Sequence, residues 1–190
     1  MAYTIAIANE KGGVAKTTTA VSLGGALVEM GKRVLLVDLD PQANLTLSLG
    51  FKPKDISLSI SQVMLNSVSL ASILQSTKVD NLDLAPSNSD LSVAERFLPV
   101  RQNFDLILKN AIENNFSYDY ILFDCPPALG AITLNAMTAA NLLLIPTQAE
   151  YFSAYALKNM MTAIRQVRTQ NNSNLIYRVL VTMFDRRNKT

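Results

Sequence analysis

The chain of 190 residues contains no histidine and a single cysteine, Cys125. Without histidine, a Ser-His-Asp triad, a histidine general base and histidine metal ligands are all excluded. One cysteine cannot form a disulfide within the chain, which fits a reducing cytoplasm. Long apolar runs are absent too, since the stretch LLLI at positions 142–145 is far shorter than a membrane span. The N-terminus lacks the basic start and long apolar core of a secretory signal.

Charged residues are also few, at 17% of the chain against 49% apolar residues, which is an ordinary globular composition. The charge is unevenly distributed. Residues 1–150 carry 10 Lys and Arg against 14 Asp and Glu, whereas residues 151–190 carry 7 against 1. The basic end fits a polyanionic partner, and it fits equally well a solvated helix face followed by a loose tail.

Apolar runs alternate with helical patterns along the whole chain. The runs predict buried strands at Thr4–Ala8, Arg33–Asp40, Leu82–Ser87, Tyr118–Pro126, Asn141–Thr147 and Tyr177–Phe184. The helical patterns lie at Thr17–Met30, which Gly31 is expected to close, and at Leu91–Leu98, Gln102–Asn115, Ala131–Ala140 and Ala154–Gln170. Residues 45–76 have a weaker pattern and predict a helical excursion over the sheet edge. We therefore expect a single α/β domain over residues 1–190, with a three-layer, doubly wound, mostly parallel sheet covered by helices on both faces.

The stretch NEKGGVAKTTTA at positions 9–20 joins the first strand to the first helix and has the elements of a phosphate-binding loop. Gly12 and Gly13 allow backbone N–H groups to approach phosphate oxygens at a helix N-terminus. Lys16 supplies a positive charge for the terminal phosphates, and the Thr17 hydroxyl is a ligand for Mg²⁺. Thr18 follows as a further hydroxyl that can bond a phosphate.

Ala15 occupies the position before Lys16, where such loops usually have glycine. Alanine would strain the loop if this residue had a positive φ, and would fit if the residue were already entering the helix with a negative φ. Because Ala15 lies two residues before Thr17, we predict the helical conformation and that ATP binding survives the substitution.

Three aspartates follow apolar strands. Asp124 ends the run YILF and is predicted to hold Mg²⁺ through water. Asp38 and Asp40 end the run RVLLVDLD, and alternation along a strand would place both on one face.

Four blocks of the sequence resemble the ParA/MinD family of P-loop ATPases. KGGVAKTT at positions 11–18 resembles the family's deviant Walker A pattern, KGGxGKT[TS], apart from the alanine. VLLVDLDPQAN at 34–44, YDYILFDCPPALG at 118–130 and IPTQAEYFSAYAL at 145–157 resemble the segments that follow it in Soj-like partition ATPases. The resemblance implies a P-loop NTPase fold and a cytoplasmic ATPase that uses ATP/ADP and Mg²⁺.

The resemblance also implies roles for single residues. Lys11 would reach across an ATP sandwich homodimer to the partner's phosphates, which makes a slow hydrolysis depend on dimerisation. Asp40 would orient the attacking water, and Asp38 would lie near the Mg²⁺ shell. The nucleotide would contact Lys11, Gly12, Gly13, Val14, Ala15, Lys16, Thr17 and Thr18 at its phosphates, and Thr182 and Met183 near the adenine.

Partition ATPases of this family bind DNA without sequence preference in their ATP form. The resemblance places DNA contacts at Arg186, Arg187 and Lys189, and implies a nucleoid-associated protein with a ParB-like or other cargo adaptor that stimulates hydrolysis. The cargo would be a plasmid, a chromosome origin or a protein compartment such as a carboxysome. Family members usually continue for some tens of residues, so the chain is either a shortened member or a fragment.

Three alternatives remain open. A MinD-like membrane-positioning ATPase would require an amphipathic tail, which is not seen, so no membrane partner is expected. A metabolic relative, either an ATP-dependent ligase or a nitrogenase-type iron protein, would need a substrate pocket or cluster cysteines. A non-hydrolysing ATP switch would result if Ala15 or the short tail blocked dimer closure.

Overall fold

A computed structural model of the chain describes residues 2–66, 68–113, 117–148 and 153–184. Its seven-stranded sheet has the order β3-β4-β2-β5-β1-β6-β7, and every neighbouring pair is parallel except the antiparallel edge pair β3–β4. The strands are β1 Tyr3–Ile7, β2 Val34–Asp38, β3 Gln75–Ser76, β4 Leu82–Ala85, β5 Tyr120–Asp124, β6 Leu142–Gln148 and β7 Ile176–Thr182. The predicted mostly parallel sheet is therefore confirmed.

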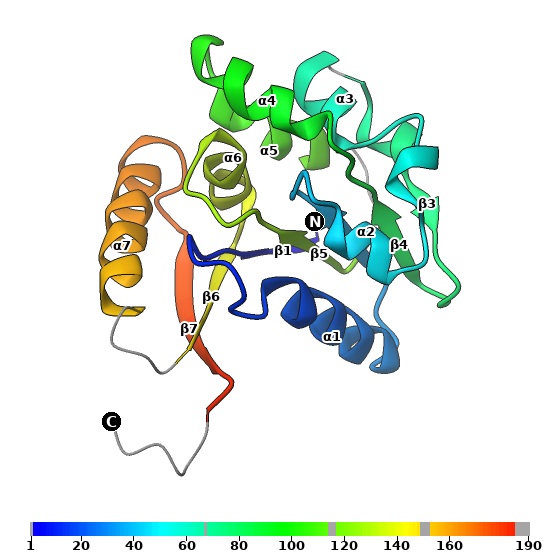
Figure 1. Ribbon diagram of the computed structural model, residues 1–190, viewed down its shortest axis with the longest axis horizontal. Coiled ribbons are helices and arrows are strands. Elements are labelled where there is room, and N and C mark those ends of the chain that lie inside the picture. The colour runs from blue at the N-terminus through cyan, green and yellow to red at the C-terminus, as the bar shows by residue number, and fades with distance from the viewer. Residues whose placement is uncertain (1, 67, 114–116, 149–152, 185–190) are drawn as a thin grey trace.

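Helices cover both faces of this sheet (Figure 1). The α-helices are α1 Lys16–Glu29, α2 Asn44–Ser48, α3 Ile60–Asn66, α4 Leu91–Phe97, α5 Ile107–Glu113, α6 Ala131–Ala139 and α7 Ser153–Gln170. Short 3-10 helices lie at η1 Pro53–Asp55, η2 Leu70–Ile73, η3 Leu98–Val100 and η4 Phe104–Leu106. In Figure 1, α1 lies on one side of β1 and β5, and α4, α5 and α6 lie on the other.

Side-chain alternation along the strands produces two separate cores. In β2, Leu35 and Val37 pack with the residues of α3 to α7, whereas Val34 and Leu36 pack with those of α1 and α2. Phe123 of β5 follows the first pattern. Because both faces of each central strand are buried, the strands read as continuous apolar runs, and the three-layer architecture follows.

The predicted elements are found with small shifts of their ends. The excursion over residues 45–76 consists of α2, η1, α3, η2 and the edge strand β3, and the helix predicted for Gln102–Asn115 is divided into η4 and α5 within the described residues. Gly31 follows α1 with φ 76°, and its N–H donates to Val28 O, so it ends the helix as predicted.

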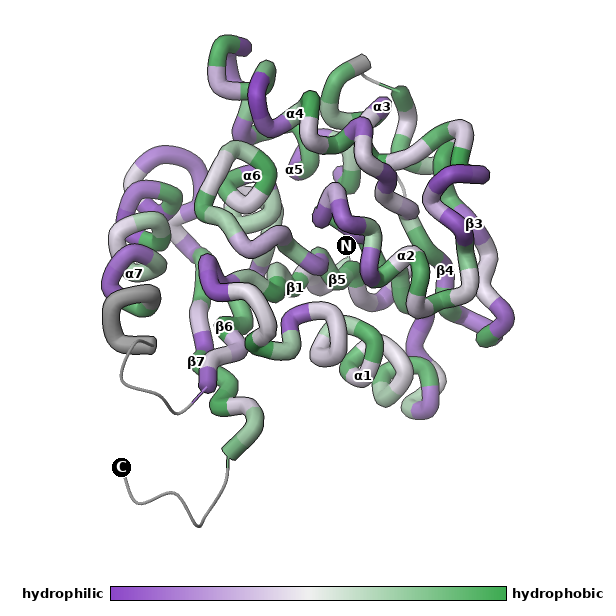
Figure 2. Tube along the Cα trace, viewed as in Figure 1, coloured by the Kyte–Doolittle hydropathy of each residue, from purple (hydrophilic) through white to green (hydrophobic). Residues whose placement is uncertain are grey.

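Strand β7 forms the edge of the sheet, and its apolar side chains remain accessible. Val179 is 45% exposed and Val181 54%, and Met183 and Phe184, just beyond the strand, are each 65% exposed. Figure 2 shows hydrophobic residues continuing along this last described segment. Within the described residues, no helix combines the length and hydropathy that a bilayer crossing requires.

Candidate functional site

The loop between β1 and α1 has a left-handed backbone at two positions. Gly13 has φ 72°, and Ala15, the N-cap residue of α1, has φ 68° and ψ 33°. The prediction that Ala15 enters the helix with a negative φ is therefore wrong. The helix begins one residue later, at Lys16, because the loop must turn sharply to present its N–H groups at the helix N-terminus. Ala15 thus adopts a conformation that glycine adopts without strain.

Lys16 lies at the centre of the site. Its side chain is buried, and its ammonium donates a hydrogen bond of 2.9 Å to the backbone oxygen of Lys11, so it curls back over the loop. Burial lowers the pKa of Lys16, and the nearby negative charges of Asp124 and Asp40 oppose that change. A desolvated ammonium is a strong binder of phosphate oxygens.

The backbone N–H groups of the loop indicate an anion-binding site. Within the part of the chain that the structure describes, the N–H groups of Val14, Ala15, Lys16 and Thr17 have no hydrogen-bond acceptor. Consecutive N–H groups in a turn that alternates hand form a concave anion-binding nest, and the dipole of α1 adds to it. Val14 contributes only its backbone, since its side chain is 1% exposed and packs inward.

Asp124 is a buried carboxylate whose environment fits a cation ligand. Neither of its oxygens has a hydrogen-bond partner among the described residues, although the residue is 1% exposed. Burial is the main cause that raises the pKa of Asp124 to about 7. The Thr17 hydroxyl lowers it from nearby, although no hydrogen bond of normal length joins the two side chains. Thr17 and Asp124 therefore fit a Mg²⁺ ion whose other ligands are water and phosphate oxygens.

This fit does not depend on a preformed cluster of acidic ligands. The described residues contain no group of three or more His, Cys, Asp or Glu side chains that would hold a metal by themselves. Mg²⁺ commonly takes only one or two protein ligands and completes its shell with water and substrate phosphates. Cys125, next to Asp124, is buried and free, as expected of a packing residue.

Asp38 and Asp40 play different structural parts. Strand β2 ends at Asp38, so Asp40 lies in the following turn and not on the strand. The Asp38 carboxylate accepts hydrogen bonds from the Thr46 N–H at 2.8 Å, the Thr46 hydroxyl at 2.7 Å and the Asp40 N–H at 3.1 Å. Its complete burial raises its pKa to about 6, and those hydrogen bonds oppose the change. Asp38 thereby fixes the turn that carries Asp40.

A cavity of about 440 Å³ lies between the loop and the turn that carries Asp40; Asp38 and Asp124 are not among the residues that line it. It is lined by Gly12, Gly13, Ala15, Lys16, Thr17, Thr18, Asp40, Gln42, Asn44, Pro127 and Met183. The structure thus brings together the predicted loop residues, Asp40 and Met183, from segments far apart in the sequence. Gln42, Asn44 and Pro127 are not among the predicted site residues. Gln42 and Asn44 follow Asp40, and Pro127 follows Asp124, within a few residues, and that proximity in sequence was the available signal.

The remaining predicted residues lie at the border of the site. Thr182 does not line the cavity; its hydroxyl lies 3.2 Å from Val14 O. Lys11 is half-buried, and its N–H donates to Asn9 Oδ1 at 3.0 Å. Arg186, Arg187 and Lys189 lie outside the described residues.

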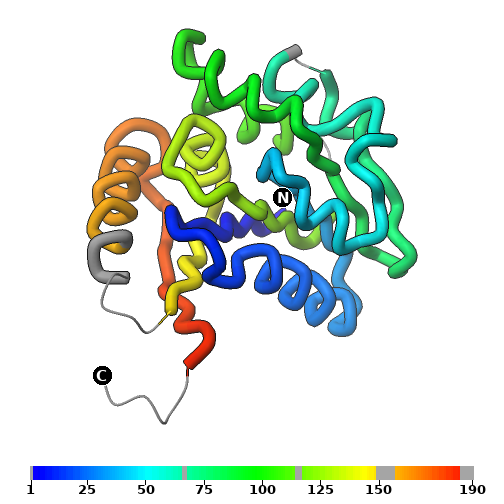
Figure 3. The backbone as a smooth tube through the Cα atoms, in the orientation of Figure 1, coloured from blue at the N-terminus to red at the C-terminus, as the bar shows by residue number. Residues whose placement is uncertain are grey.

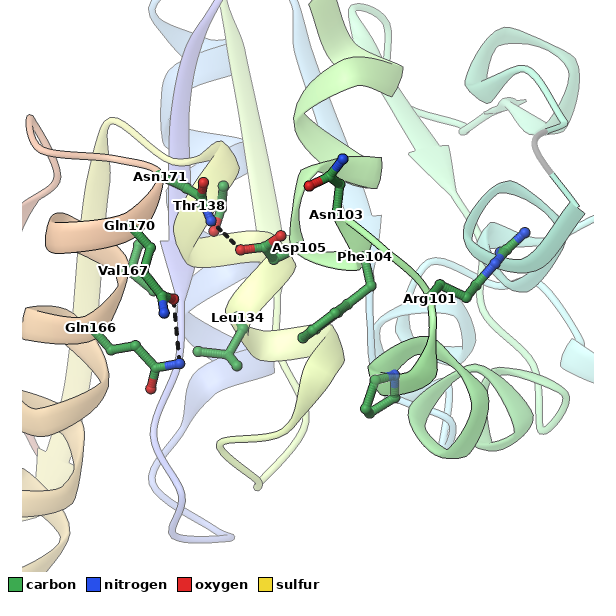
Figure 4. Close-up of a pocket in the computed structure, with 11 residues that line it drawn as sticks. Arg101, Asn103, Phe104, Asp105, Leu134, Thr138, Gln166, Val167, Gln170 and Asn171 are labelled. Carbon is green, nitrogen blue, oxygen red and sulfur yellow. Dashed lines mark hydrogen bonds between the residues drawn. The ribbon is translucent and has the colours of Figure 1, made fainter.

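A second cavity, of about 390 Å³, lies between α6, α7 and η4, at the end of α7 that leads into β7 (Figure 4). Its wall contains a hydrogen bond from Asn171 Nδ2 to Asp105 and the apolar side chains of Phe104, Leu134 and Val167. None of the predicted site residues lines it.

The loop, the helix N-terminus, the buried lysine and the orphaned aspartate together define a P-loop nucleotide-binding protein. Comparison with known proteins agrees. Residues 2–177 match the family model described as an AAA domain. The sporulation initiation inhibitor protein Soj of Bacillus subtilis is 42% identical over 189 residues, which cover 98% of this chain and 75% of that protein.

The chromosome partitioning protein ParA of Caulobacter vibrioides is 41% identical, over 97% of this chain and 70% of that protein. Among solved structures, that of cobyrinic acid a,c-diamide synthase from Mycobacterium smegmatis, with bound ATP analog and magnesium, has a TM-score of 0.93. It is 40% identical over 99% of this chain and 78% of that one. The chain belongs to the ParA/Soj family of partition ATPases.

Proposed function

We propose that this chain is a partition ATPase that binds MgATP at the β1–α1 loop, forms an ATP sandwich dimer and then binds DNA without sequence preference. The carrying observation is the set of unpartnered N–H groups at residues 14–17 beside the buried Lys16 ammonium. These donors match the terminal phosphates of a nucleoside triphosphate. The similar Mycobacterium smegmatis protein, solved with bound ATP analog and magnesium, supports the same ligands for this chain.

Each side chain has a distinct role in this proposal. The Lys16 ammonium would leave Lys11 O and bind the β- and γ-phosphate oxygens, while Asp40, held by the Asp38 turn, would orient the attacking water. Mg²⁺ held by Thr17, and through water by Asp124, would neutralise charge that develops on the phosphates. Lys11 of each protomer would reach the other protomer's nucleotide, so that hydrolysis would require dimerisation.

Hydrolysis would end DNA binding, and an adaptor protein on the cargo would stimulate it. The Soj and ParA relatives support a role in chromosome partition, and a plasmid or a protein compartment is the alternative cargo. The Mycobacterium smegmatis protein is named as a cobyrinic acid a,c-diamide synthase, and no observation in this chain favours that activity.

The basic end of the chain is the proposed DNA contact, through Arg186, Arg187 and Lys189. Of the two arginines in α7, Arg165 is exposed, whereas Arg168 donates to Leu175 O at 2.9 and 2.5 Å and lies over the ring of Tyr177. Arg168 thus has a structural role, and we expect it to contribute little to DNA binding.

The test is binding of the full chain to non-specific duplex DNA, measured by fluorescence anisotropy with ATP, with ADP and without nucleotide, at low and moderate salt. We expect binding only with ATP, weakening steeply with salt. Replacing the cations at positions 186, 187 and 189 by alanine should abolish it, whereas replacing the exposed Lys52 and Lys54 should not. Binding that ignores nucleotide would contradict the switch, and ATP-dependent binding to anionic liposomes instead of DNA would indicate a membrane-positioning ATPase.

A further inference from the structure

The ends of β6 and β7 hold the phosphate loop from its outer side. Gln148, the last residue of β6, donates from Nε2 to Gly13 O at 3.3 Å. Thr182, the last residue of β7, lies with its hydroxyl 3.2 Å from Val14 O and 3.2 Å from Thr147 O. Figure 3 shows the loop before α1 near these strand ends, although 135 and 168 residues separate the partners in sequence.

These contacts constrain the direction of two consecutive peptide units, although the single Thr182 hydroxyl hydrogen is shared between Val14 O and Thr147 O. Gln148 and Thr182 are not among the residues that line the nucleotide cavity, and the carbonyl oxygens of Gly13 and Val14 are directed at these two side chains. A trans peptide places its N–H opposite its C=O. The N–H groups that share these peptide units, those of Val14 and Ala15, therefore face the opposite direction. Gly13 and Ala15, on either side of Val14, both line the nucleotide cavity.

The entrance of the loop is held by strand β6 and by helix α7. Asn9 donates from Nδ2 to Pro146 O of β6 at 2.7 Å. Glu10 accepts two hydrogen bonds from Asn159 Nδ2 of α7, at 3.0 and 3.1 Å. The loop thus has anchors along its length in the β6–α7–β7 segment, while its own residues supply the phosphate donors.

We propose that Gln148 and Thr182 are positioning residues for phosphate binding, because they keep the Gly13 and Val14 carbonyls turned outward and so aim the Val14 and Ala15 N–H groups at the nucleotide. The inference rests on the proposed binding of ATP and ADP by this loop. It gives Thr182 a role at the loop backbone, distinct from the adenine contact that the family resemblance implies.

The conformation of the loop should depend on these outer hydrogen bonds, because its backbone is strained. Both held peptide units lie between Gly13 and Ala15, the two residues with left-handed backbone. A left-handed alanine favours relaxation to another conformation, in which the N–H groups would point elsewhere. Removing an outer hydrogen bond should therefore lower the population of the binding-competent loop and weaken phosphate binding by about that factor.

The test compares Thr182→Val, which keeps the shape and removes the donor, with Thr182→Ser, which keeps the donor. We expect Thr182→Val to weaken binding of both ADP and ATP about five- to tenfold, measured by calorimetry on the full chain, and Thr182→Ser to restore it. Thr147→Val is the matched control, because the buried Thr147 hydroxyl on the adjacent strand has no partner among the described residues. It should leave the affinity unchanged.

Gln148→Met provides a second variant, since it removes the donor at the other carbonyl while retaining a long side chain. It should weaken ADP binding by a similar factor, with the melting temperature showing that the chain is folded. Wild-type affinity in both Thr182→Val and Gln148→Met would overturn the proposal. A Thr182→Val change that appears mainly as an altered ATP-to-GTP preference would also overturn it, by returning Thr182 to base recognition.

Nucleotide binding by the loop and the positioning role of Thr182 would be refuted by different results. If the wild-type chain bound neither ADP nor ATP, phosphate binding itself would be refuted together with any positioning role. If the wild type bound both nucleotides and the serine variant were as weak as the valine variant, only the positioning role of the hydroxyl would fail.

Discussion

Relief of the strain at Ala15 gives a direct test of the loop's conformation. With φ 68°, an L-residue costs roughly 1–2 kcal/mol relative to the right-handed helical region, whereas glycine adopts this conformation freely. Glycine loses roughly 0.5–1 kcal/mol of this gain through the greater freedom of its unfolded chain. Ala15→Gly should therefore stabilise the protein by about 0.5–1 kcal/mol. For a chain of 190 residues, that raises the melting temperature by about 1–4 °C.

The assay is thermal unfolding of the nucleotide-free chain, followed by circular dichroism. Gly31→Ala is the matched inverse control, because Gly31 has φ 76° and a Cβ placed there would meet no atom within 4 Å. It should cost about 1 kcal/mol with no effect on nucleotide affinity, since it lies beyond the far end of α1. Gly13→Ala, with φ 72° and equally open space, should add the same strain within the loop and lower the melting temperature by a similar amount.

The ATP affinity of the Ala15→Gly variant tests whether the strain at this residue is the same in the nucleotide-free and nucleotide-bound loop. If the loop keeps its left-handed turn with and without nucleotide, the strain cancels between the two states. The ATP dissociation constant should then change by less than about tenfold. A melting temperature that falls on replacement by glycine would refute the left-handed assignment, because an alanine in the helical region stabilises a helix relative to glycine.

Three further predictions concern the aspartates. The pKa of Asp124 is raised to about 7, so as the pH rises the unfolded chain releases this proton before the folded chain does. The stability of the nucleotide-free protein should therefore fall as the pH rises from about 4 to about 7, which melting curves across pH would show. Asp124→Asn should flatten that fall, and calorimetry should show that it abolishes Mg²⁺-dependent ATP binding. Thr46→Val removes a hydroxyl donor from buried Asp38 and should cost about 1–3 kcal/mol in urea denaturation, with Thr46→Ser near wild type; equal loss in both variants would contradict the hydroxyl's role. Asp40→Ala should bind ATP and dimerise in size-exclusion chromatography but release no phosphate, and full turnover would remove Asp40 from the mechanism.

The sheet could be predicted from sequence because each strand is buried on both faces. Runs such as VLLVD in β2 and YILFD in β5 have few other structural solutions when turns and helical patterns flank them. The region between α2 and β4 was harder, since its 3-10 turns and the two-residue strand β3 have no periodicity of their own. Their form depends on packing against the sheet edge.

Within the site, residue types were predictable and backbone directions were not. Helix propensity favoured a right-handed Ala15, but the geometry of an anion-binding turn overrides a propensity of less than about 1 kcal/mol. Gln148 could not be assigned from sequence for a different reason. Its partner in the loop is a backbone carbonyl, and carbonyls have no sequence identity. The hydrogen bonds of Asp38 could not be predicted either, because its main partner, Thr46, lies in α2 and comes next to Asp38 only in the folded chain.

The electrostatics of the site explain why nucleotide and cation belong together. Asp40 and Asp124 lie near the buried Lys16 ammonium, and Asp38 and Asp40 lie near Asp124, so the carboxylates repel one another. Two of these carboxylates have raised pKa values, which shows that burial without sufficient positive charge disfavours their ionised forms. A free nucleotide polyphosphate would add to this repulsion even though the loop's N–H groups attract it. A phosphate group that arrives with a divalent cation satisfies the N–H groups and the carboxylate of Asp124 at once, so the loop and the aspartates act as a single site for a cation–nucleotide complex.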